Sequence, residues 1–178
     1  MPSAKVHGRP PLAKPTPLKP SHILDDFNST EDVLNDWLKK RAHLALASRT
    51  ATTFVVCRSD RVVGYYSLAT GSISHTDSTS NLRRNTPDPI PAIVLARLAV
   101  SREEGGRGIG RSLVQDAMNR SLVAARHIAA RTLIVHALNT EVADFYRRFG
   151  FIDLPAREGS ISLHLKLATI AASLTAPK

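Results

Sequence analysis

Leu95-Ala96-Arg97-Leu98-Ala99-Val100, followed after four residues by Gly105-Gly106-Arg107-Gly108-Ile109-Gly110-Arg111-Ser112-Leu113, is the stretch that decides the fold. It predicts a buried strand, a glycine-rich loop and an amphipathic helix. Glycines let the backbone approach a ligand closely, and the first N–H groups of a helix lack intrahelical partners, so the loop favours an anion such as phosphate. It has neither the Lys-Ser or Lys-Thr ending of a Walker A loop nor the spacing of a dinucleotide fingerprint, which argues against ATP and NAD.

A second strand and helix follow farther along the chain. Residues 131–138 form a β-branched apolar run, which predicts a buried strand. Residues 139–150 predict a short helix that is capped by Asn139 and ends at Gly150. The other expected elements are a helix from about 31 to 46, strands at about 52–58 and 62–74, a polar loop at 76–91, a helix from about 108 to 129, and strands near 151–155 and 160–167.

Length and composition fit one globular domain in a reducing compartment. The chain has 178 residues, of which 43% are hydrophobic and 22% charged. No apolar run is long enough for a membrane span, and the N-terminus lacks a signal-peptide pattern. Cys57 is the only cysteine and is expected to be a buried hydrophobe, and the seven histidines show no metal-ligand spacing. We therefore expect a cytoplasmic protein without a metal site.

The charge balance points to a polyanionic partner. The net charge is +9, and nucleic acid is the commonest partner of such a basic domain. Residues 1–20 hold four cations, six prolines and no acid, which predicts a flexible basic tail. The remaining cations cluster at residues 39–41, 83–84 and 147–148, and each cluster is equally compatible with an ordinary solvated surface. One domain is expected at 21–167, followed at 168–178 by a C-terminal tail that is either frayed or helical.

Both motifs together resemble the GNAT N-acetyltransferases. These enzymes hold the pyrophosphate of acetyl-CoA on a loop of the type Gln/Arg-x-x-Gly-x-Gly/Ala, which here matches Gly108 and Gly110 but has Gly105 at the Gln/Arg position. The pattern Asn-x-x-Ala-x-x-Phe-Tyr-x-x-Phe-Gly-Phe at residues 139–151 resembles the second half of that fold. The resemblance implies an α/β fold, a mixed twisted sheet flanked by helices, in which two splayed central strands hold acetyl-CoA.

The same resemblance implies roles for individual residues. The phenol of Tyr146 matches the family's proton donor to the leaving thiolate, and the backbone N–H of Val100 matches its oxyanion donor. Tyr146 is thus the expected catalytic residue, with a buried core aromatic as the alternative. Acetyl-CoA binding is expected at Leu98, Ala99, Val100, Gly105, Gly106, Arg107, Gly108, Ile109, Gly110, Arg111, Ser112, Asn139 and Phe145.

Residues 20–167 resemble a narrower group, the GNAT toxins of bacterial type II toxin–antitoxin modules. The segments that carry this resemblance are Trp37-Leu38-Lys39-Lys40-Arg41, Thr53-Phe54-Val55-Val56-Cys57, Gly64-Tyr65-Tyr66-Ser67-Leu68-Ala69-Thr70-Gly71, Leu82-Arg83-Arg84-Asn85 with Pro87-Asp88-Pro89-Ile90-Pro91, and Val135-His136-Ala137-Leu138. Membership implies acetylation of the α-amino group of aminoacyl-tRNA, inhibition of translation, a ribbon-helix-helix antitoxin and a homodimer. We expect Lys40, Arg41, Arg83 and Arg84 to contact the tRNA.

Elementary chemistry is compatible with this reaction. An α-amino group has a pKa near 7.7–8.0 in model compounds, so a useful fraction is an unprotonated nucleophile at neutral pH and no strong base is needed. Two alternatives stay open at this point. One is a GNAT enzyme that acetylates a protein N-terminus or a small amine, and the other is a non-catalytic domain that binds nucleic acid or an antitoxin.

Overall fold

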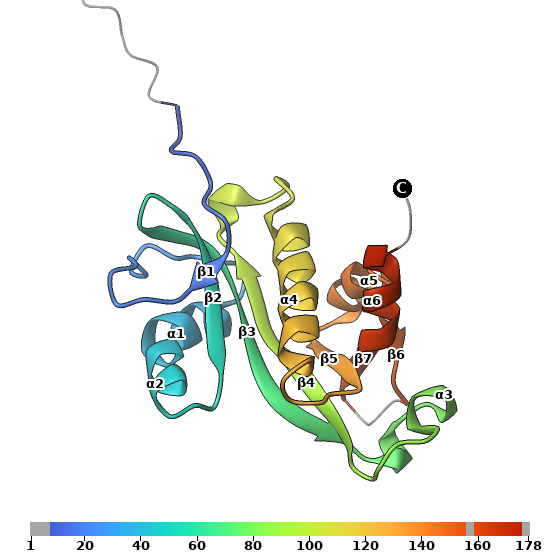
Figure 1. The fold of residues 1–178 in the computed structure, drawn as a ribbon. Coiled ribbons are helices and arrows are strands. Elements are labelled where there is room, and N and C mark those ends of the chain that lie inside the picture. The colour runs from blue at the N-terminus through green and yellow to red at the C-terminus, as the bar shows by residue number, and fades with distance from the viewer. Residues whose placement is uncertain (1–7, 156–158, 176–178) are drawn as a thin grey trace, which may run out of the picture.

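The computed structural model describes residues 8–155 and 159–175 and consists of one seven-stranded sheet with helices on both faces (Figure 1). The strands are β1 (Thr16–Pro17), β2 (Thr52–Arg58), β3 (Arg61–Ile73), β4 (Ile90–Val100), β5 (Thr132–Ala137), β6 (Ile152–Asp153) and β7 (Ile161–Lys166). Their order is β1-β2-β3-β4-β5-β7-β6, and only β4 and β5 pair in parallel. This is the mixed α/β sheet that the sequence predicts.

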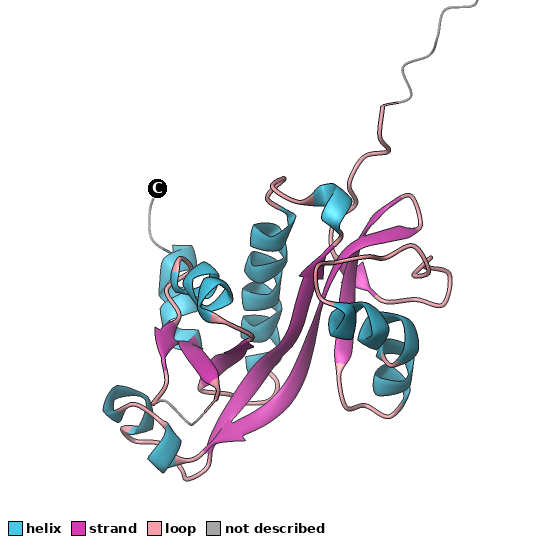
Figure 2. Cartoon of the chain, turned by 180° about the vertical axis from the view of Figure 1, so that it is seen from behind, coloured by secondary structure: helices cyan, strands magenta, loops and turns pink. Residues whose placement is uncertain are grey.

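Successive side chains along the strands point to opposite faces of the sheet, so the hydrophobic core is divided between the two faces. Phe54, Val56 and Tyr66 pack under α4 (Ile109–Ala125), α5 (Thr140–Arg147) and α6 (Leu167–Thr175). Their neighbours Val55 and Tyr65 belong to a second cluster under α1 (Asp32–Lys40), and α2 (Ala42–Ala47) follows α1 on that side (Figure 2). The short helix α3 (Ser80–Arg83) lies at the far end of β3 and β4 (Figure 1).

The central strands separate halfway along their length. Residues 92–95 of β4 pair with residues 132–135 of β5, and beyond Leu95 the β5 side of β4 has no strand partner in the described chain. At this point β4 also has an extra residue, Ala96, relative to β3, because Leu95 pairs with Leu68 whereas Arg97 pairs with Ser67. Such a bulge bends a strand and increases its twist, so it separates residues 96–100 from β5. The predicted splayed pair is confirmed.

Several boundaries differ from those predicted. The helix expected from about 31 to 46 is two helices, because Arg41 has φ −122° and ψ −27° and interrupts the helical backbone. The helix expected to continue to about 129 ends at Ala125, and Ile128 beyond it is exposed. The polar loop at 76–91 contains α3, whose first turn is capped by the side chain of Thr79.

Of the flexible basic tail expected at 1–20, residues 12–18 lie along the edge of the sheet. Strand β1 extends the sheet at β2, Leu18 is 3% exposed, and Leu18 N–H donates to Thr53 O at 2.9 Å. The carbonyl oxygens of Pro10 and Pro15 accept bonds from Arg58 and Arg120, at 2.6 and 3.0 Å. Prolines are tolerated on an edge strand because the edge leaves some N–H groups without a ladder partner. Residues 1–7 lie outside the described chain.

The C-terminal tail expected at 168–178 is helical over its described part. Helix α6 packs against α4 and β7, and its Ile170 is buried in the main core. Cys57 is buried as expected, and burial raises the pKa of its thiol to about 11. None of the helices in the described ranges is long and apolar enough to cross a membrane.

Candidate active site

A cleft of about 320 Å³ lies where β4 separates from β5. One wall is β4 from Leu95 to Val100, a second is the end of β5 with the start of α5, and a third is the segment that leads into α1. The residues of the second and third walls are His136, Leu138, Val142 and Tyr146, and Ser29, Thr30, Glu31 and Leu34. The structure therefore brings the predicted residues Leu98, Ala99, Val100 and Tyr146 together in one cleft.

Tyr146 is held rigidly and keeps its hydroxyl proton. Its ring packs edge-on against Phe145 and Phe151, at centroid distances of 5.2 and 5.6 Å. The side chain is 6% exposed, and burial raises the pKa of its phenol well above the usual value. The hydroxyl bonds to no described residue, yet it is not sealed from solvent. A protonated phenol with a free donor is suited to act as a general acid in the cleft.

The glycine-rich loop between β4 and α4 has the backbone geometry of an anion site. Gly106 and Gly108 have φ angles of +72° and +77°, which side-chain-bearing residues rarely adopt. A Cβ atom at either position would meet nothing within 4 Å, so that side of the loop is open. Gly108 is the N-cap of α4 and no side chain caps this helix, so the N–H groups of its first turn are available to a ligand.

The loop also has a buried acidic anchor, which sequence reasoning missed. Glu104 is 4% exposed and accepts two hydrogen bonds from Arg58, at 2.7 and 3.0 Å. Arg107 and Arg9 lie 3.5 and 3.6 Å from the same carboxylate. The hydrogen bonds from Arg58 lower the pKa of Glu104. The ionised Glu104 carboxylate therefore anchors the start of the glycine-rich loop to Arg58 on β2. The local sequence at residues 102–105, Arg-Glu-Glu-Gly, does not predict that Glu104 is buried, because its partner Arg58 is 46 residues away.

The other residues predicted to bind acetyl-CoA surround this loop. A Cβ on Gly110 would contact Phe145 and Val100 at 3.7 and 3.8 Å, which places the first turn of α4 against α5 and β4. Arg111 and Phe145 line a hollow of about 200 Å³. Ile109 is buried in the core, so only its backbone is available to a ligand. Ser112 donates to Gly108 O at 3.3 Å.

Asn139 is engaged in local structure. Its side-chain oxygen accepts from Val142 N–H at 2.9 Å and caps α5, as the sequence predicts. A contact of Asn139 with acetyl-CoA stays a prediction.

The four residues expected to contact tRNA do not form one patch. Lys40 and Arg41 are exposed at the end of α1, and Lys40 pairs with Asp36 at 2.9 Å. Arg83 and Arg84 lie at α3, at the opposite end of the sheet (Figures 1 and 2). Arg83 is partly engaged, because it donates to His75 O at 3.3 Å. A single ligand that contacts Lys40 and Arg41 as well as the two arginines at α3 must extend across the sheet.

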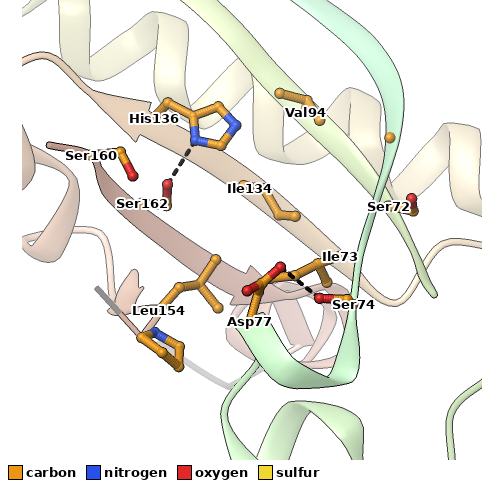
Figure 3. Close-up of a pocket in the computed structure, with 12 residues that line it drawn as sticks. Ser72, Ile73, Ser74, Asp77, Val94, Ile134, His136, Leu154, Ser160 and Ser162 are labelled. Atoms are coloured by element: carbon orange, nitrogen blue, oxygen red, sulfur yellow. Dashed lines mark hydrogen bonds between the residues drawn. The ribbon is translucent and has the colours of Figure 1, made fainter. Parts of the chain in front are cut away.

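Two charged or ionisable side chains on the strands of the cleft, Arg97 and His136, were not predicted as site residues. Arg97 lines it from β4 and lies over the Trp37 ring, with Cζ 4.2 Å from the ring centroid. His136 lines the cleft from β5 and also borders a groove of about 420 Å³ on the open sheet face, where its Nδ1 lies 2.8 Å from Ser162 Oγ (Figure 3). Both are polar positions within otherwise apolar strands, and that contrast is the sequence signal that could have identified them.

Comparisons with known proteins agree with this geometry. Residues 49–153 match the family described as "Acetyltransferase (GNAT) domain". The chain is 48% identical over 125 residues to a tRNA-acetylating toxin of Mycobacterium tuberculosis (strain ATCC 25618 / H37Rv), which covers 70% of this chain and 75% of the relative.

Solved structures of toxins have the same fold. The toxin AtaT complexed with acetyl-methionyl-tRNAfMet matches with a TM-score of 0.84 and 27% identity, covering 93% of this chain and 100% of that one. A tyrosine-to-phenylalanine mutant of AtaT, bound to the C-terminus of the antitoxin AtaR and acetyl-CoA, matches with a TM-score of 0.79 and 26% identity over 93% and 99% of the two chains.

Proposed function

Because the chain belongs to the GNAT acetyltransferase family, we propose that it transfers the acetyl group of acetyl-CoA to the α-amino group of aminoacyl-tRNA and so inhibits translation as a toxin. The cleft at the separation of β4 and β5 is the observation that carries this proposal, because it combines a buried phenol with an open stretch of strand. The 48% identity to a tRNA-acetylating toxin supports the choice of acceptor.

Acetyl-CoA would supply the activated thioester, and the fold offers a matching set of donors. The open loop at Gly106 and Gly108, the uncapped start of α4 and the cations Arg107 and Arg111 suit its pyrophosphate. Residues 98–100 of β4 lack a strand partner on the β5 side, so their backbone can pair with the extended pantetheine arm. Gly105 offers no side-chain donor, and binding at this end therefore depends on backbone amides and the two arginines.

Tyr146 acts as the general acid. As the amine nitrogen bonds to the acetyl carbon and the carbon–sulfur bond breaks, the phenol donates its proton to the departing sulfur. The nitrogen that becomes the amide releases a proton to water, and the Tyr146 phenolate takes a proton back from water, so the phenol is regenerated and the protons balance. The Val100 N–H stabilises the negative charge that develops on the acetyl oxygen. Crystallised mutants of AtaT and KacT carry a tyrosine-to-phenylalanine change, which is the substitution that tests Tyr146 here.

The acceptor approaches from the α1 side of the cleft. Lys40 and Arg41 at one end of the sheet, with Arg83 and Arg84 at the other, bind phosphates of a tRNA that crosses this face. The positions of these cations, far apart on one molecule, fit an extended polyanion better than a small amine.

Assembly and location follow from the same assignment. We infer a homodimer that is neutralised by a ribbon-helix-helix antitoxin and acts in the cytoplasm, where charged tRNA is found. The structures of AtaT with the C-terminus of AtaR and of a KacTA–DNA complex support an antitoxin partner, because both concern toxins of the same fold.

The direct test is acetyl transfer to total charged tRNA. Purified protein is incubated with radiolabelled acetyl-CoA and aminoacyl-tRNA, and label that precipitates with RNA and is released by mild base is counted. We expect label only when the tRNA is charged. Label on deacylated tRNA would place the acetyl group on the nucleotides, and transfer to peptide N-termini without transfer to charged tRNA would favour a protein acceptor.

A further inference from the structure

Arg97 is a partly buried cation to which the described chain gives no anionic partner. Its side chain makes no hydrogen bond or ion pair to any described residue, although it lines the active-site cleft. Its guanidinium lies over Trp37, which in turn stacks on Tyr65 at 6.0 Å with an interplanar angle of 12°. Arginine stays charged in proteins, and this one is oriented before any ligand arrives. Such an arrangement favours a planar, bidentate contact with phosphate or carboxylate.

Partial burial of the charged Arg97 guanidinium costs free energy, and an anion bound to it would offset that cost. Partial desolvation lowers the pKa of Arg97 from its ordinary value, with only a small opposing effect from Tyr65. Glu31 is the carboxylate that lines the same cleft, but it lies outside ion-pair distance of Arg97. The positive charge at Arg97 is therefore uncompensated in the free protein.

The face of the sheet on which the Arg97 side chain lies decides which anion can reach it. Along β4, Leu98 and Val100 pack towards the core under α4, whereas Ala99 belongs to the cluster under α1 that includes Trp37. Arg97 lies over Trp37 and is therefore on the α1 face. The glycine-rich loop leads into α4 on the opposite face. The phosphates held by that loop are on the wrong side, so the anion at Arg97 comes with the acceptor.

We propose that Arg97 binds the phosphodiester preceding the terminal adenosine of the aminoacyl-tRNA and thereby positions the α-amino group beside Tyr146. This inference rests on the proposed function. The amino acid is esterified to the terminal ribose, whose 5′ phosphate is the anion nearest to the reacting amine. Because Arg97 and Tyr146 line one cleft, that phosphate is the one within reach when the amine is in place. Arg97 is thus a positioning residue.

Three substrates that differ in their phosphates test the assignment. They are charged tRNA, the aminoacyl-CpA dinucleotide with one phosphodiester, and aminoacyl-adenosine with none, each carrying the amino acid that the wild type acetylates in total charged tRNA. Arg97→Met removes the charge but keeps an apolar stem on Trp37. Arg126→Met is the matched control, because Arg126 is exposed at the end of α4, away from the cleft.

We expect Arg97→Met to lower kcat/KM about tenfold to a hundredfold for charged tRNA and aminoacyl-CpA, the range for a charge-assisted hydrogen bond. The rate with aminoacyl-adenosine should stay within twofold. Arg97→Lys should recover part of the loss, since it restores charge without the planar fork. The slope of log kcat/KM for aminoacyl-CpA against log salt should fall in magnitude by about 0.7, as for one lost contact to a single strand. Arg126→Met should show none of these effects.

Other outcomes overturn the proposal. An equal loss with all three substrates would mean that Arg97 supports the fold or the amine, and thermal melting and acetyl-CoA affinity would show which. If acetylation is unchanged but Arg97→Met loses affinity for the antitoxin, the anion is a protein carboxylate. A wild type that acetylates no aminoacyl-tRNA in total charged tRNA would refute the proposed function itself, whereas an active wild type without the substrate-dependent loss refutes only the role of Arg97.

Discussion

Replacing Tyr146 with phenylalanine should abolish most acetyl transfer without disturbing the fold. The hydroxyl makes no hydrogen bond to a described residue, so its removal breaks none of the hydrogen bonds in residues 8–155 and 159–175. The ring keeps its edge-on contacts with Phe145 and Phe151. We therefore expect the free energy of unfolding to change by less than about 0.5 kcal/mol, the usual range for a substitution without such a feature.

The loss should appear in the chemical step. General acid catalysis contributes about 10²–10⁴ in rate, which corresponds to roughly 3–5.5 kcal/mol of activation free energy. Single-turnover acetylation of charged tRNA should slow by that factor, while the affinities for acetyl-CoA and tRNA stay within about twofold. Because burial raises the pKa of the phenol, the wild-type rate should rise with the deprotonation of the amine and show no falling limb from Tyr146 up to pH 9.

Tyr66→Phe provides the matched control. Tyr66 is also buried, but its hydroxyl donates to Asp116 Oδ2 at 2.5 Å, outside the cleft. This change should destabilise the protein by about 1.5–3 kcal/mol, as expected for a hydrogen bond to a charged group, and leave single-turnover acetylation near normal. If Tyr146→Phe reacts within about threefold of the wild-type rate, the assigned role is wrong and a water molecule or another donor protonates the sulfur.

Three further predictions concern stability and the acceptor surface. Leu18→Ala should lower the free energy of unfolding in urea by about 2–5 kcal/mol because Leu18 is buried, whereas exposed Leu12→Ala should have little effect; equal values would contradict the docking of this segment. Between pH 7 and pH 5 the protein should lose about 2 kcal/mol through His164, because burial holds its folded-state pKa at about 4 while the unfolded value is near 6.5, so the unfolded chain alone binds a proton in this window. His164→Gln should remove that part of the pH dependence, and an unchanged difference would exclude His164 as its source. Reversing the charges of Arg83 and Arg84 should weaken tRNA binding and reduce its salt slope by up to about one unit per lost phosphate contact while sparing acetyl-CoA binding; an unchanged slope would place the tRNA elsewhere.

The fold was predictable because its signals are local. The glycine-rich loop and the capped helix at 139–150 each identify a strand–helix unit within about 20 residues, and both units form as expected. The two positive φ angles in the loop leave glycine as the preferred residue, so the sequence pattern follows directly from the backbone. Tyr146 and residues 98–100 were assigned to one site through the resemblance of these two units to GNAT enzymes, and the structure places them in one cleft.

The missed features depend on long-range pairing. The six prolines among the first 20 residues favoured a tail, yet residues 12–18 lie along β2, because an exposed strand edge offers hydrogen-bonding groups that a Pro-rich chain can partly satisfy. Glu104 and Arg97 are charged residues whose burial is set by partners far along the chain, Arg58 and Trp37. No local pattern distinguishes such residues from solvated ones, since burial arises only when the sheet is assembled.

The bulge at Ala96 explains how one strand can serve two polyanionic substrates. Beyond it, β4 is free of β5, and its side chains alternate between the α4 face and the α1 face. Both substrates would carry phosphates, so their approach to a shared cleft is opposed by repulsion unless each charge is neutralised where it lies. Arg107 lies on the loop that leads into α4 and Arg111 in the first turn of that helix, whereas Arg97 lies on the other face of the sheet. Placing the cations on opposite faces keeps the phosphates apart and lets the uncharged reacting groups meet in the gap beside Tyr146.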